Sequence, residues 1–451
     1  MPTEVNRIRN RKGMPPAKLS ARERGVFRWA AAIFLAIIAD GALRKWVLPS
    51  SAQAIPYFAK DVLAGLFVLR YPQLKQARLA KRLMPFVFGI GLCLAPAFLV
   101  GLTKVPIGAV VVFKNAVLWP LFAVRMGSYL TEGVTERLWK LALVCTVPMA
   151  VLASIQYFAG PSSILNRYAW DETTFGVAAT GDLVRATGTF SYIAGLSSFS
   201  IVMFCLFLGR SLSARGGAEL WLATLGLASA VVCGIVSESR GIQVFMAAVS
   251  VAAVVLIPKK QSVRLIGGLL GAAFAFALVW NSSLSQGVSE RWMKTDNEEV
   301  AGRLTGSSTG QPIASTLSAN PIGSGLGLYV GVSASTRSTA DLDYNESAAN
   351  RIAAEAGLPG FLATLLGLGL VISAGRATLL SGDSTRKSRL LPIAVGALIQ
   401  LVFGTWYDHT AAGLWWWTIS LWLEDGVAFG HARRILAKPA PQFVAIAVRK
   451  A

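Results

Sequence analysis

About a dozen long apolar runs dominate this chain of 451 residues. As a helix, a run of about 18 or more apolar residues is long enough to cross the roughly 30 Å of hydrocarbon in a lipid bilayer. Charged residues make up only 15% of the sequence, whereas soluble globular proteins carry about 25%. This pattern excludes a soluble enzyme, a disordered protein and a secreted scaffold held by disulfides, and it predicts an all-α polytopic membrane protein.

The apolar runs predict about twelve membrane-spanning helices. Their expected ranges are 26–43, 53–69, 83–103, 105–124, 138–159, 188–209, 219–236, 241–258, 265–281, 353–375, 390–407 and 410–430. Two polar stretches interrupt the pattern, at 160–187 and 282–352. The expected organisation is a basic N-terminal segment (1–25), spans one to nine (26–281), a large loop (282–352), spans ten to twelve (353–430) and a C-terminal tail (431–451).

The distribution of positive charge predicts the orientation of the chain. There are 43 lysine and arginine residues against 23 acidic residues, which gives a net charge of +20. Most of these cations fall in the N-terminal segment, in the connections that follow even-numbered spans, and in the C-terminal tail. Because cytoplasmic segments are enriched in lysine and arginine, we expect both termini in the cytoplasm and both long polar stretches outside. The excess charge then orients the chain and attracts anionic lipid, so nucleic acid is not an expected partner.

Two arginines are expected at the outer membrane surface. Arg240 lies in Ser-Glu-Ser-Arg-Gly, a short turn between spans seven and eight, and Arg185 lies just before span six. A guanidinium group offers a planar, permanently charged fork that suits phosphate, and a pyrophosphate requires more than one cation. The alternative is structural, with Glu238 and Arg240 forming an ion pair that caps a tight turn.

The large outer loop ends in a dense motif. Its Gly-x-Gly-x-Gly cluster at 323–327 is not part of a visible strand–helix unit, so it predicts tight turns rather than nucleotide binding. Glu346, Asn350 and Arg351 follow at helical spacing, as do Arg351 and Glu355. The motif is consistent with an amphipathic, salt-bridged entry to span ten, or with one carboxylate acting as a general base at the membrane surface.

Other polar residues fall within or beside the spans. Lys60 and Asp61 are adjacent and could neutralise each other, and Lys114 must find a partner in the bundle or reach the interface. His409 is either a base or a hydrogen-bonded structural group, and Trp415 to Trp417 suit an interfacial belt or packing. No cluster of histidine, cysteine and carboxylate residues has metal-ligand spacing, so we expect neither a metal nor another cofactor.

With these motifs the chain resembles the O-antigen ligase and polysaccharide polymerase superfamily. The shared features are the twelve spans, the large outer loop between spans nine and ten, and three motifs: Arg-x-x-Gly-Thr-Phe at 185–190, Ser-Arg-Gly at 239–241 and Ala-Glu-x-Gly-Leu-Pro-Gly at 354–360. The resemblance implies a bacterial inner-membrane glycosyltransferase with a helical fold of the GT-C type. Such enzymes use undecaprenyl-pyrophosphate-linked glycans on the periplasmic side, without a metal or a nucleotide sugar.

The resemblance also implies roles for individual residues. It assigns Arg185 and Arg240 to the pyrophosphate of the donor. In the ligases, a histidine and an Asn, Ser or Gln precede nine residues and a Gly-x-x-Gly. Aligning this motif on the glycines at 357 and 360 puts Glu346 at the histidine position and Ser347 after it. This departure from the ligases favours a polymerase-like or exopolysaccharide-specific member.

The expected chemistry is direct displacement with inversion at the anomeric carbon. Glu346 is expected to be the base that activates the acceptor hydroxyl, while the two arginines stabilise the charge of the departing pyrophosphate. Four further residues are expected to contact the substrate: Arg303, Arg351, Glu238 and His409.

The expected function is polymerisation of lipid-linked oligosaccharide repeat units into a surface polysaccharide. The expected partners are the lipid-linked donor, a glycan acceptor, the lipid bilayer and, where chain length is controlled, a regulator. One alternative is a ligase that transfers a finished glycan to lipid A core or another acceptor. Another is a transporter or flippase of a lipid-linked or anionic substrate. Against a transporter stand the lack of a repeat between the first and last six spans and the single large outer loop.

Overall fold

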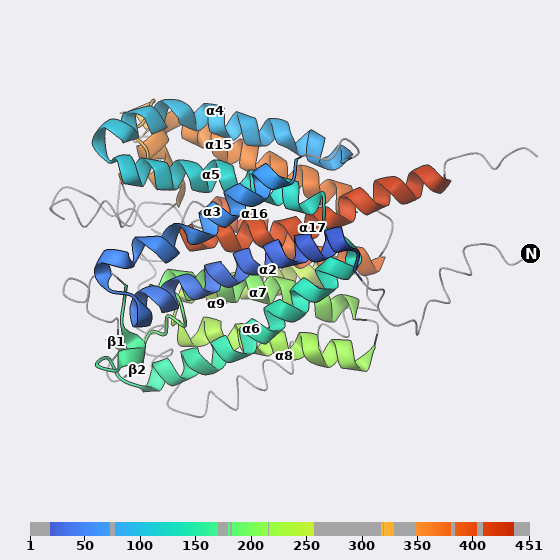
Figure 1. Cartoon of the computed structure of the whole chain (residues 1–451), viewed down its shortest axis with the longest axis horizontal. Coiled ribbons are helices and arrows are strands. Elements are labelled where there is room, and N and C mark those ends of the chain that lie inside the picture. The colour runs from blue at the N-terminus through green and yellow to red at the C-terminus, as the bar shows by residue number, and fades with distance from the viewer. Residues whose placement is uncertain are drawn as a thin grey trace, which may run out of the picture.

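The structure is a computed structural model that describes residues 19–72, 77–169, 179–180, 183–214, 216–256, 317–318, 320–328, 348–379, 384–403 and 409–436. Figure 1 shows these residues as a bundle of roughly parallel and antiparallel helices, with a small β-hairpin at one end. The longer helices are α2 (Ala21–Ala42), α3 (Ala54–Arg70), α4 (Arg78–Lys104), α5 (Pro106–Gly127), α6 (Glu132–Phe158), α7 (Ile193–Ser213), α8 (Gly217–Val236), α9 (Arg240–Leu256), α15 (Ala348–Leu379), α16 (Ser384–Phe403) and α17 (His409–Leu436).

Shorter elements lie in the connections between these helices. A π-helical turn, η1 (Leu43–Val47), extends α2 and is followed by the 3₁₀ turn η2 (Ser50–Ala52). Between α6 and α7 lie the 3₁₀ turn η3 (Ile164–Asn166) and the strands β1 (Ala179–Thr180) and β2 (Leu183–Val184). The two strands pair antiparallel, with Ala179 opposite Val184.

The prediction of an all-α polytopic membrane protein is confirmed. Within the described residues, 8 helical segments are long and apolar enough to cross a membrane, and α9 is a shorter apolar helix. The expected span at 265–281 and most of the loop at 282–352 lie outside the described residues. The full number of twelve spans and the size of the loop therefore stay predictions.

Helix boundaries differ from the expected ones where side chains bind the backbone. Helix α2 begins at Ala21, within the expected N-terminal segment, because Ser20 and Glu23 form a capping box that supplies partners for free backbone N–H groups. Helix α7 begins at Ile193, not at 188, because Gly188 has a φ of +58° and the side chain of Gln156 binds the amides of Thr187 and Gly188.

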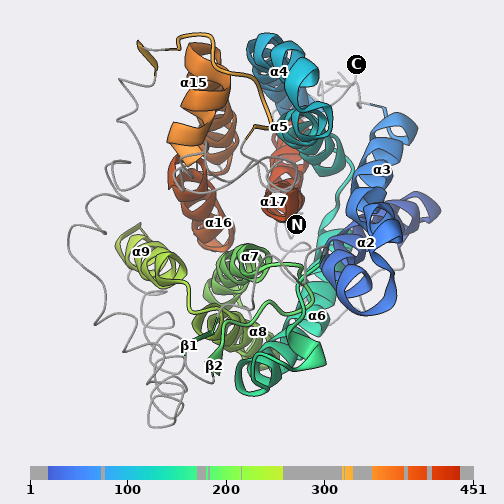
Figure 2. The ribbon, with the colours of Figure 1, turned by 90° about the vertical axis from the view of Figure 1, so that its left-hand side faces the viewer.

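Two helices form the centre of the bundle. Helix α7 is buried along almost its whole length and packs on α8, α16 and α17, and Figure 2 places α7 and α17 inside the ring of other helices. Trp415, Trp416 and Trp417 of α17 are all buried. The indole of Trp417 stacks on Phe34 at 4.3 Å and donates to the carbonyl of Ala30 at 3.1 Å. These tryptophans pack the core, so their interpretation as an interfacial belt is wrong.

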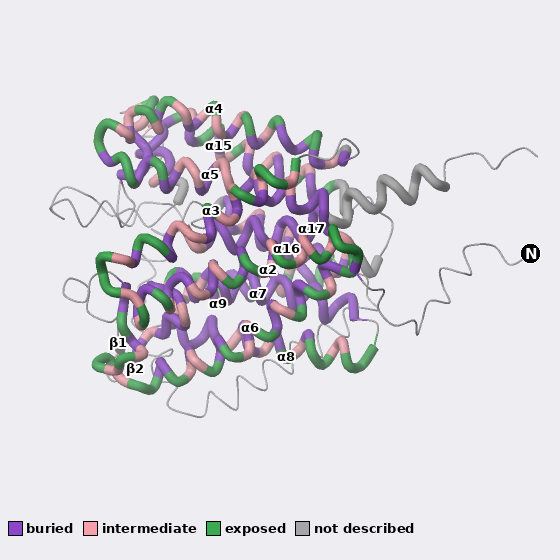
Figure 3. The backbone as a smooth tube through the Cα atoms, in the orientation of Figure 1, coloured by how far each residue is buried: buried purple, intermediate pink, exposed green. Residues whose placement is uncertain are grey.

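The outer faces of the helices carry the apolar residues that remain exposed. Figure 3 shows exposed positions along the outer sides of the bundle, while buried positions line its interior. Large apolar side chains on these outer faces include Leu69, Phe88, Leu92 and Val144. Many exposed large apolar side chains are costly in water and are expected of helices that face lipid.

Helices joined by described connections run in opposite directions, so these connections alternate between the two ends of the bundle. The π turn η1, the α4–α5 connection and the β-hairpin lie at the left-hand end in Figure 1. The turn between α8 and α9 and the start of α15 lie at the same end. We call this end the hairpin end.

Candidate functional site

The hairpin end gathers every predicted site residue that the structure describes. Arg185 precedes α7, Glu238 and Arg240 lie where α8 turns into α9, Arg351 is in the first turns of α15, and His409 opens α17. The predicted base Glu346 and the loop residue Arg303 lie outside the described residues. The described residues of the predicted charged motifs therefore lie at one end of the bundle.

Arg185 lies against the turn that leads to Arg240. The amide of Ala186 donates to the carbonyl of Val236 at 3.0 Å, and Nε of Arg185 donates to the carbonyl of Ser237 at 3.2 Å. These contacts join segments about fifty residues apart in the chain. The two motifs that carry the predicted phosphate-binding arginines are thus neighbours in space.

Glu238 holds this turn in an unusual conformation. Its φ is +49°, it is the only non-glycine residue with positive φ in the described part of the chain, and it is 1% exposed. Its carboxylate accepts a hydrogen bond from the Tyr157 hydroxyl at 3.2 Å. Backbone strain of this kind persists where the surrounding structure enforces it, often at binding sites. The buried position of Glu238 suits a group that fixes the turn before Arg240.

Gln156 fixes the other side of the Arg185 segment. Its side-chain oxygen accepts from the amides of Thr187 and Gly188, at 3.2 and 2.6 Å. Its side-chain nitrogen donates to the carbonyls of Gly188 and Leu165, at 3.0 and 2.8 Å. A fully buried amide with all these bonds satisfied leaves the segment little freedom.

The glycine cluster of the large loop forms tight turns, as the sequence predicts. Gly323, Gly325 and Gly327 have φ of +85°, +115° and +86°. Glu355 holds this turn: its backbone carbonyl accepts from the amide of Gly325 at 2.9 Å, and its carboxylate accepts from the amide of Gly327 at 3.0 Å. Arg351 lies 3.8 Å from the same carboxylate. The predicted salt-bridged entry to α15 is confirmed for the pair Arg351–Glu355.

We expect Gly327→Ala to destabilise the protein by about 2–4 kcal/mol, because it adds strain at positive φ to a steric clash. A Cβ atom at position 327 would lie 2.1 Å from the backbone carbon of Gly108. Gly65→Ala is the matched control, because no atom lies within 4 Å of the added Cβ, and this change should stabilise its helix by about 0.5–1 kcal/mol. Thermal unfolding in detergent measures both, and equal midpoints would contradict the expectation.

A buried charged network begins at the same end and extends into the interior of the bundle. Its members come from four helices and η1, and all are buried or nearly so: Asp40, Arg44, Lys60, Asp61, Lys114 and His409. Asp40 is its first centre, with Nζ of Lys60 at 2.6 Å and Nε of Arg44 at 3.0 Å from its two oxygens. Arg44 in turn donates to the hydroxyl of Ser191, which links the network to the segment that follows Arg185.

Asp61 is the second centre of the network. Nζ of Lys114 lies 2.8 Å from one carboxylate oxygen, and the indole N–H of Trp119 donates to the other at 3.1 Å. The carbonyl of Tyr57 joins the two centres, because it accepts from Lys60 at 3.1 Å and lies 2.7 Å from Nε2 of His409. A continuous set of polar contacts thus links α2, α3, α5 and α17.

The contacts of His409 determine its tautomer. The Tyr57 carbonyl can only accept a hydrogen bond, so Nε2 carries the proton. Nδ1 lies 3.0 Å from the ammonium of Lys114 and accepts from it. The ring also stacks on Tyr57 at 3.8 Å. His409 is therefore a buried, hydrogen-bonded member of the network, and both ring nitrogens are engaged.

The predicted pairing of Lys60 with Asp61 is wrong. Adjacent residues on a helix point about 100° apart, so they do not face each other. Lys60 pairs with Asp40 on α2, and Asp61 pairs with Lys114 on α5. The expectation that Lys114 finds a partner inside the bundle is confirmed. The signal for the whole network was present in the sequence, because ionisable residues within apolar runs are rare and costly.

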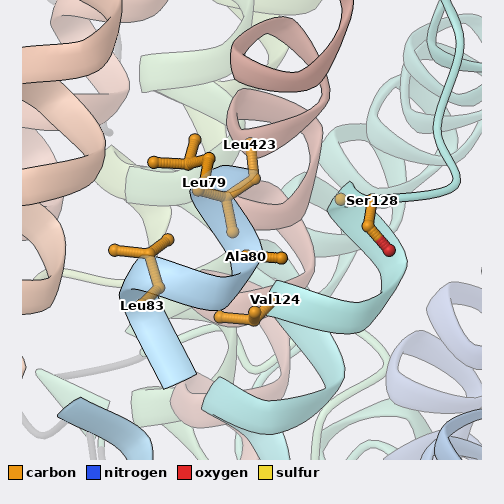
Figure 4. Close-up of a pocket in the computed structure, with 7 residues that line it drawn as sticks. Leu79, Ala80, Leu83, Val124, Ser128 and Leu423 are labelled. Atoms are coloured by element: carbon orange, nitrogen blue, oxygen red, sulfur yellow. The ribbon is translucent and has the colours of Figure 1, made fainter. Parts of the chain in front are cut away.

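The structure does not bring all of these groups to one point. In the end-on view of Figure 2, α15, which carries Arg351, lies across the bundle from β1, β2 and α8. A shallow apolar hollow lies at the opposite end of the bundle, between α4, α5 and α17. Figure 4 shows its lining, in which Ser128 is the one polar side chain among Leu79, Ala80, Leu83, Val124 and Leu423. This lining offers nothing to a charged head group.

Within the described residues, no group of three or more histidine, cysteine or carboxylate side chains could hold a metal ion. No known family model and no curated protein matches the sequence.

Proposed function

We propose that this protein is a membrane glycosyltransferase that polymerises undecaprenyl-pyrophosphate-linked repeat units on the outer side of the bacterial inner membrane. The observation that carries the proposal is the contact between the Arg185 segment and the turn that leads to Arg240. Two guanidinium groups on adjoining segments at one end of the bundle suit a pyrophosphate at the membrane surface.

The proposed chemistry requires charge stabilisation more than it requires a metal. As the glycosidic bond to the pyrophosphate breaks, negative charge grows on the leaving phosphate oxygen, and fixed cations stabilise it. The hydrogen bonds of Gln156 and the strained turn at Glu238 would hold the arginine-bearing segments before the substrate arrives. Glu346 remains the proposed base for the acceptor hydroxyl, which would attack the anomeric carbon from the opposite face.

A transporter of an anionic substrate is the second candidate, and the buried charged network favours it. Chains of ionisable residues inside membranes occur in proton- and ion-coupled transporters. Two observations favour the transferase instead. Helices α3 and α5 run unbroken through the positions of Lys60, Asp61 and Lys114, whereas transporters place such residues on helices that are broken at mid-membrane. In addition, the charged residues of the predicted motifs lie at the hairpin end, as far as the structure describes them.

Deleting the gene and sizing the undecaprenyl-linked glycan that accumulates tests the proposal. We expect single repeat units to accumulate, and we expect the wild-type gene, but not Glu346→Gln, to restore long chains. A Glu346→Gln copy with full activity would remove the base assignment and leave the polymerase function in place.

The same measurement separates the alternatives. Long lipid-linked chains in the deletion strain would mean a ligase, because the finished glycan would then lack a route to its acceptor. An unchanged lipid-linked glycan would contradict both transferase functions and favour the transporter.

A further inference from the structure

Lys45 is a buried lysine that has no acidic partner among the residues that the structure describes. It is 6% exposed, and its Nζ donates to the hydroxyl of Thr187 at 2.9 Å and to the carbonyl of Gly188 at 2.7 Å. The ammonium also lies 4.6 Å from the centre of the Trp46 ring. In the described part of the chain, no carboxylate lies within ion-pairing distance of it. By contrast, the buried Lys60 and the partly buried Lys114 each contact an aspartate.

Burying an ammonium without a counter-charge is costly, and a bound anion lowers that cost. An ammonium has three N–H donors, and Lys45 uses two of them on Thr187 and Gly188. The hydroxyl of Thr187 accepts from Lys45, so its own O–H is free to donate, and it has no acceptor among the described residues. The third N–H of Lys45 and the O–H of Thr187 are thus two buried, neighbouring donors that can bind a ligand.

The backbone turns Lys45 toward this position. Lys45 lies in η1, the π-helical turn that ends α2, and π turns are rare and frequently occur at functional sites. The same turn directs Arg44 to Ser191 and Lys45 to Thr187. Both cations of η1 therefore contact the segment that begins with Arg185.

We propose that Lys45 and Thr187 form an anion subsite, which binds a phosphate oxygen of the lipid-linked donor beside Arg185. This inference rests on the proposed function, because it assigns a further part of the donor to that site. The ligand class is a phosphate or diphosphate group, whose oxygens accept from an ammonium and a hydroxyl at once. Lys45 would bind the diphosphate from the side of α2, and Arg185 would bind it from the side of the α8–α9 turn.

The test is binding of undecaprenyl pyrophosphate to the purified full-length protein in nanodiscs. We expect Lys45→Met to weaken binding at least about tenfold and Thr187→Val to weaken it several-fold. Lys45→Arg and Thr187→Ser should restore most of the affinity, because they keep the charge and the hydroxyl. Lys104→Met is the matched control: Lys104 is an exposed lysine at the same end that donates to the carbonyl of Ser324, and its loss should leave binding unchanged.

Two further measurements keep the test decisive. Thermal unfolding shows which variants keep their fold, and Thr187→Val carries the test if Lys45→Met does not. Inorganic pyrophosphate, used as a competitor, separates the sources of the anion. Competition that depends on Lys45 would support a site that recognises the diphosphate alone. Tight binding of the lipid without competition by inorganic pyrophosphate would support a site that also requires the lipid.

The two proposals fail in different ways. If the wild-type protein binds the lipid diphosphate and polymerises glycan while folded Lys45→Met and Thr187→Val variants bind it equally well, the subsite is overturned and the proposed function stands. If the wild-type protein does not bind the lipid diphosphate, both are overturned.

Discussion

Replacing Arg185 with methionine is expected to lower the rate of glycan transfer by about 10²–10³-fold. Removing one fixed donor that stabilises developing negative charge has an effect of this size in other enzymes. Arg185→Lys should retain part of the activity, about a tenth, because a lysine keeps the charge but loses the planar fork that binds two oxygens. The measurement is the initial rate of polymer formation from lipid-linked repeat units by the purified protein in nanodiscs.

Arg167 provides the matched control for this prediction. It is an exposed arginine in the same connection between α6 and α7, and Arg167→Met should leave the rate within about twofold of wild type. Arg240→Met should cause a loss similar to that of Arg185→Met. If both arginines bind one pyrophosphate, the double variant should lose less than the product of the single losses. Full activity in Arg185→Met would overturn the assignment of this arginine to the donor.

Replacing Asp40 with asparagine is expected to destabilise the bundle by about 3–5 kcal/mol. This carboxylate contacts both Lys60 and Arg44, at 2.6 and 3.0 Å, and Lys60 is completely buried. Removing one member of a buried ion pair leaves an uncompensated charge, and the cost falls in this range. The free energy of unfolding, measured by denaturant titration in mixed micelles, tests the expectation.

Glu132→Gln is the control for the loss of a carboxylate. Glu132 is an exposed residue in the first turn of α6, where its charge is worth no more than about 1 kcal/mol. Adding Lys60→Met to Asp40→Asn should recover part of the stability, because the double change removes a buried cation together with its partner. A loss below about 1 kcal/mol in Asp40→Asn would mean that the ion pairs do not hold the helices together.

The local features of the sequence predicted the helices well, because a helix that crosses a membrane is specified by the length and apolarity of its own residues. The boundaries that moved are those set by side chains, as at Ser20 and Gln156. The glycine turns were also predictable, since Gly323, Gly325 and Gly327 adopt positive φ where a Cβ atom would be strained.

The sequence indicated the candidate site only in part. The motifs at Arg185 and Arg240 were visible as short polar segments between apolar runs, and the structure brings these segments into contact. Arg351 was predicted to bind substrate, and the structure pairs it with Glu355. Lys45 was not predicted to bind a ligand, because a lysine at the end of a span is common and its burial depends on the neighbouring helices.

By itself, then, the sequence determined that this chain forms apolar helices for a membrane, and where its tight turns fall. The tertiary structure alone decided which charges meet. Lys60 pairs with Asp40 and not with Asp61, Lys114 contacts His409, which is 295 residues away in the sequence, and Lys45 donates to Thr187. The physical reason is that the apolarity of a segment depends only on its own residues. The partner of a single charged side chain depends instead on how each helix is rotated and packed against the others.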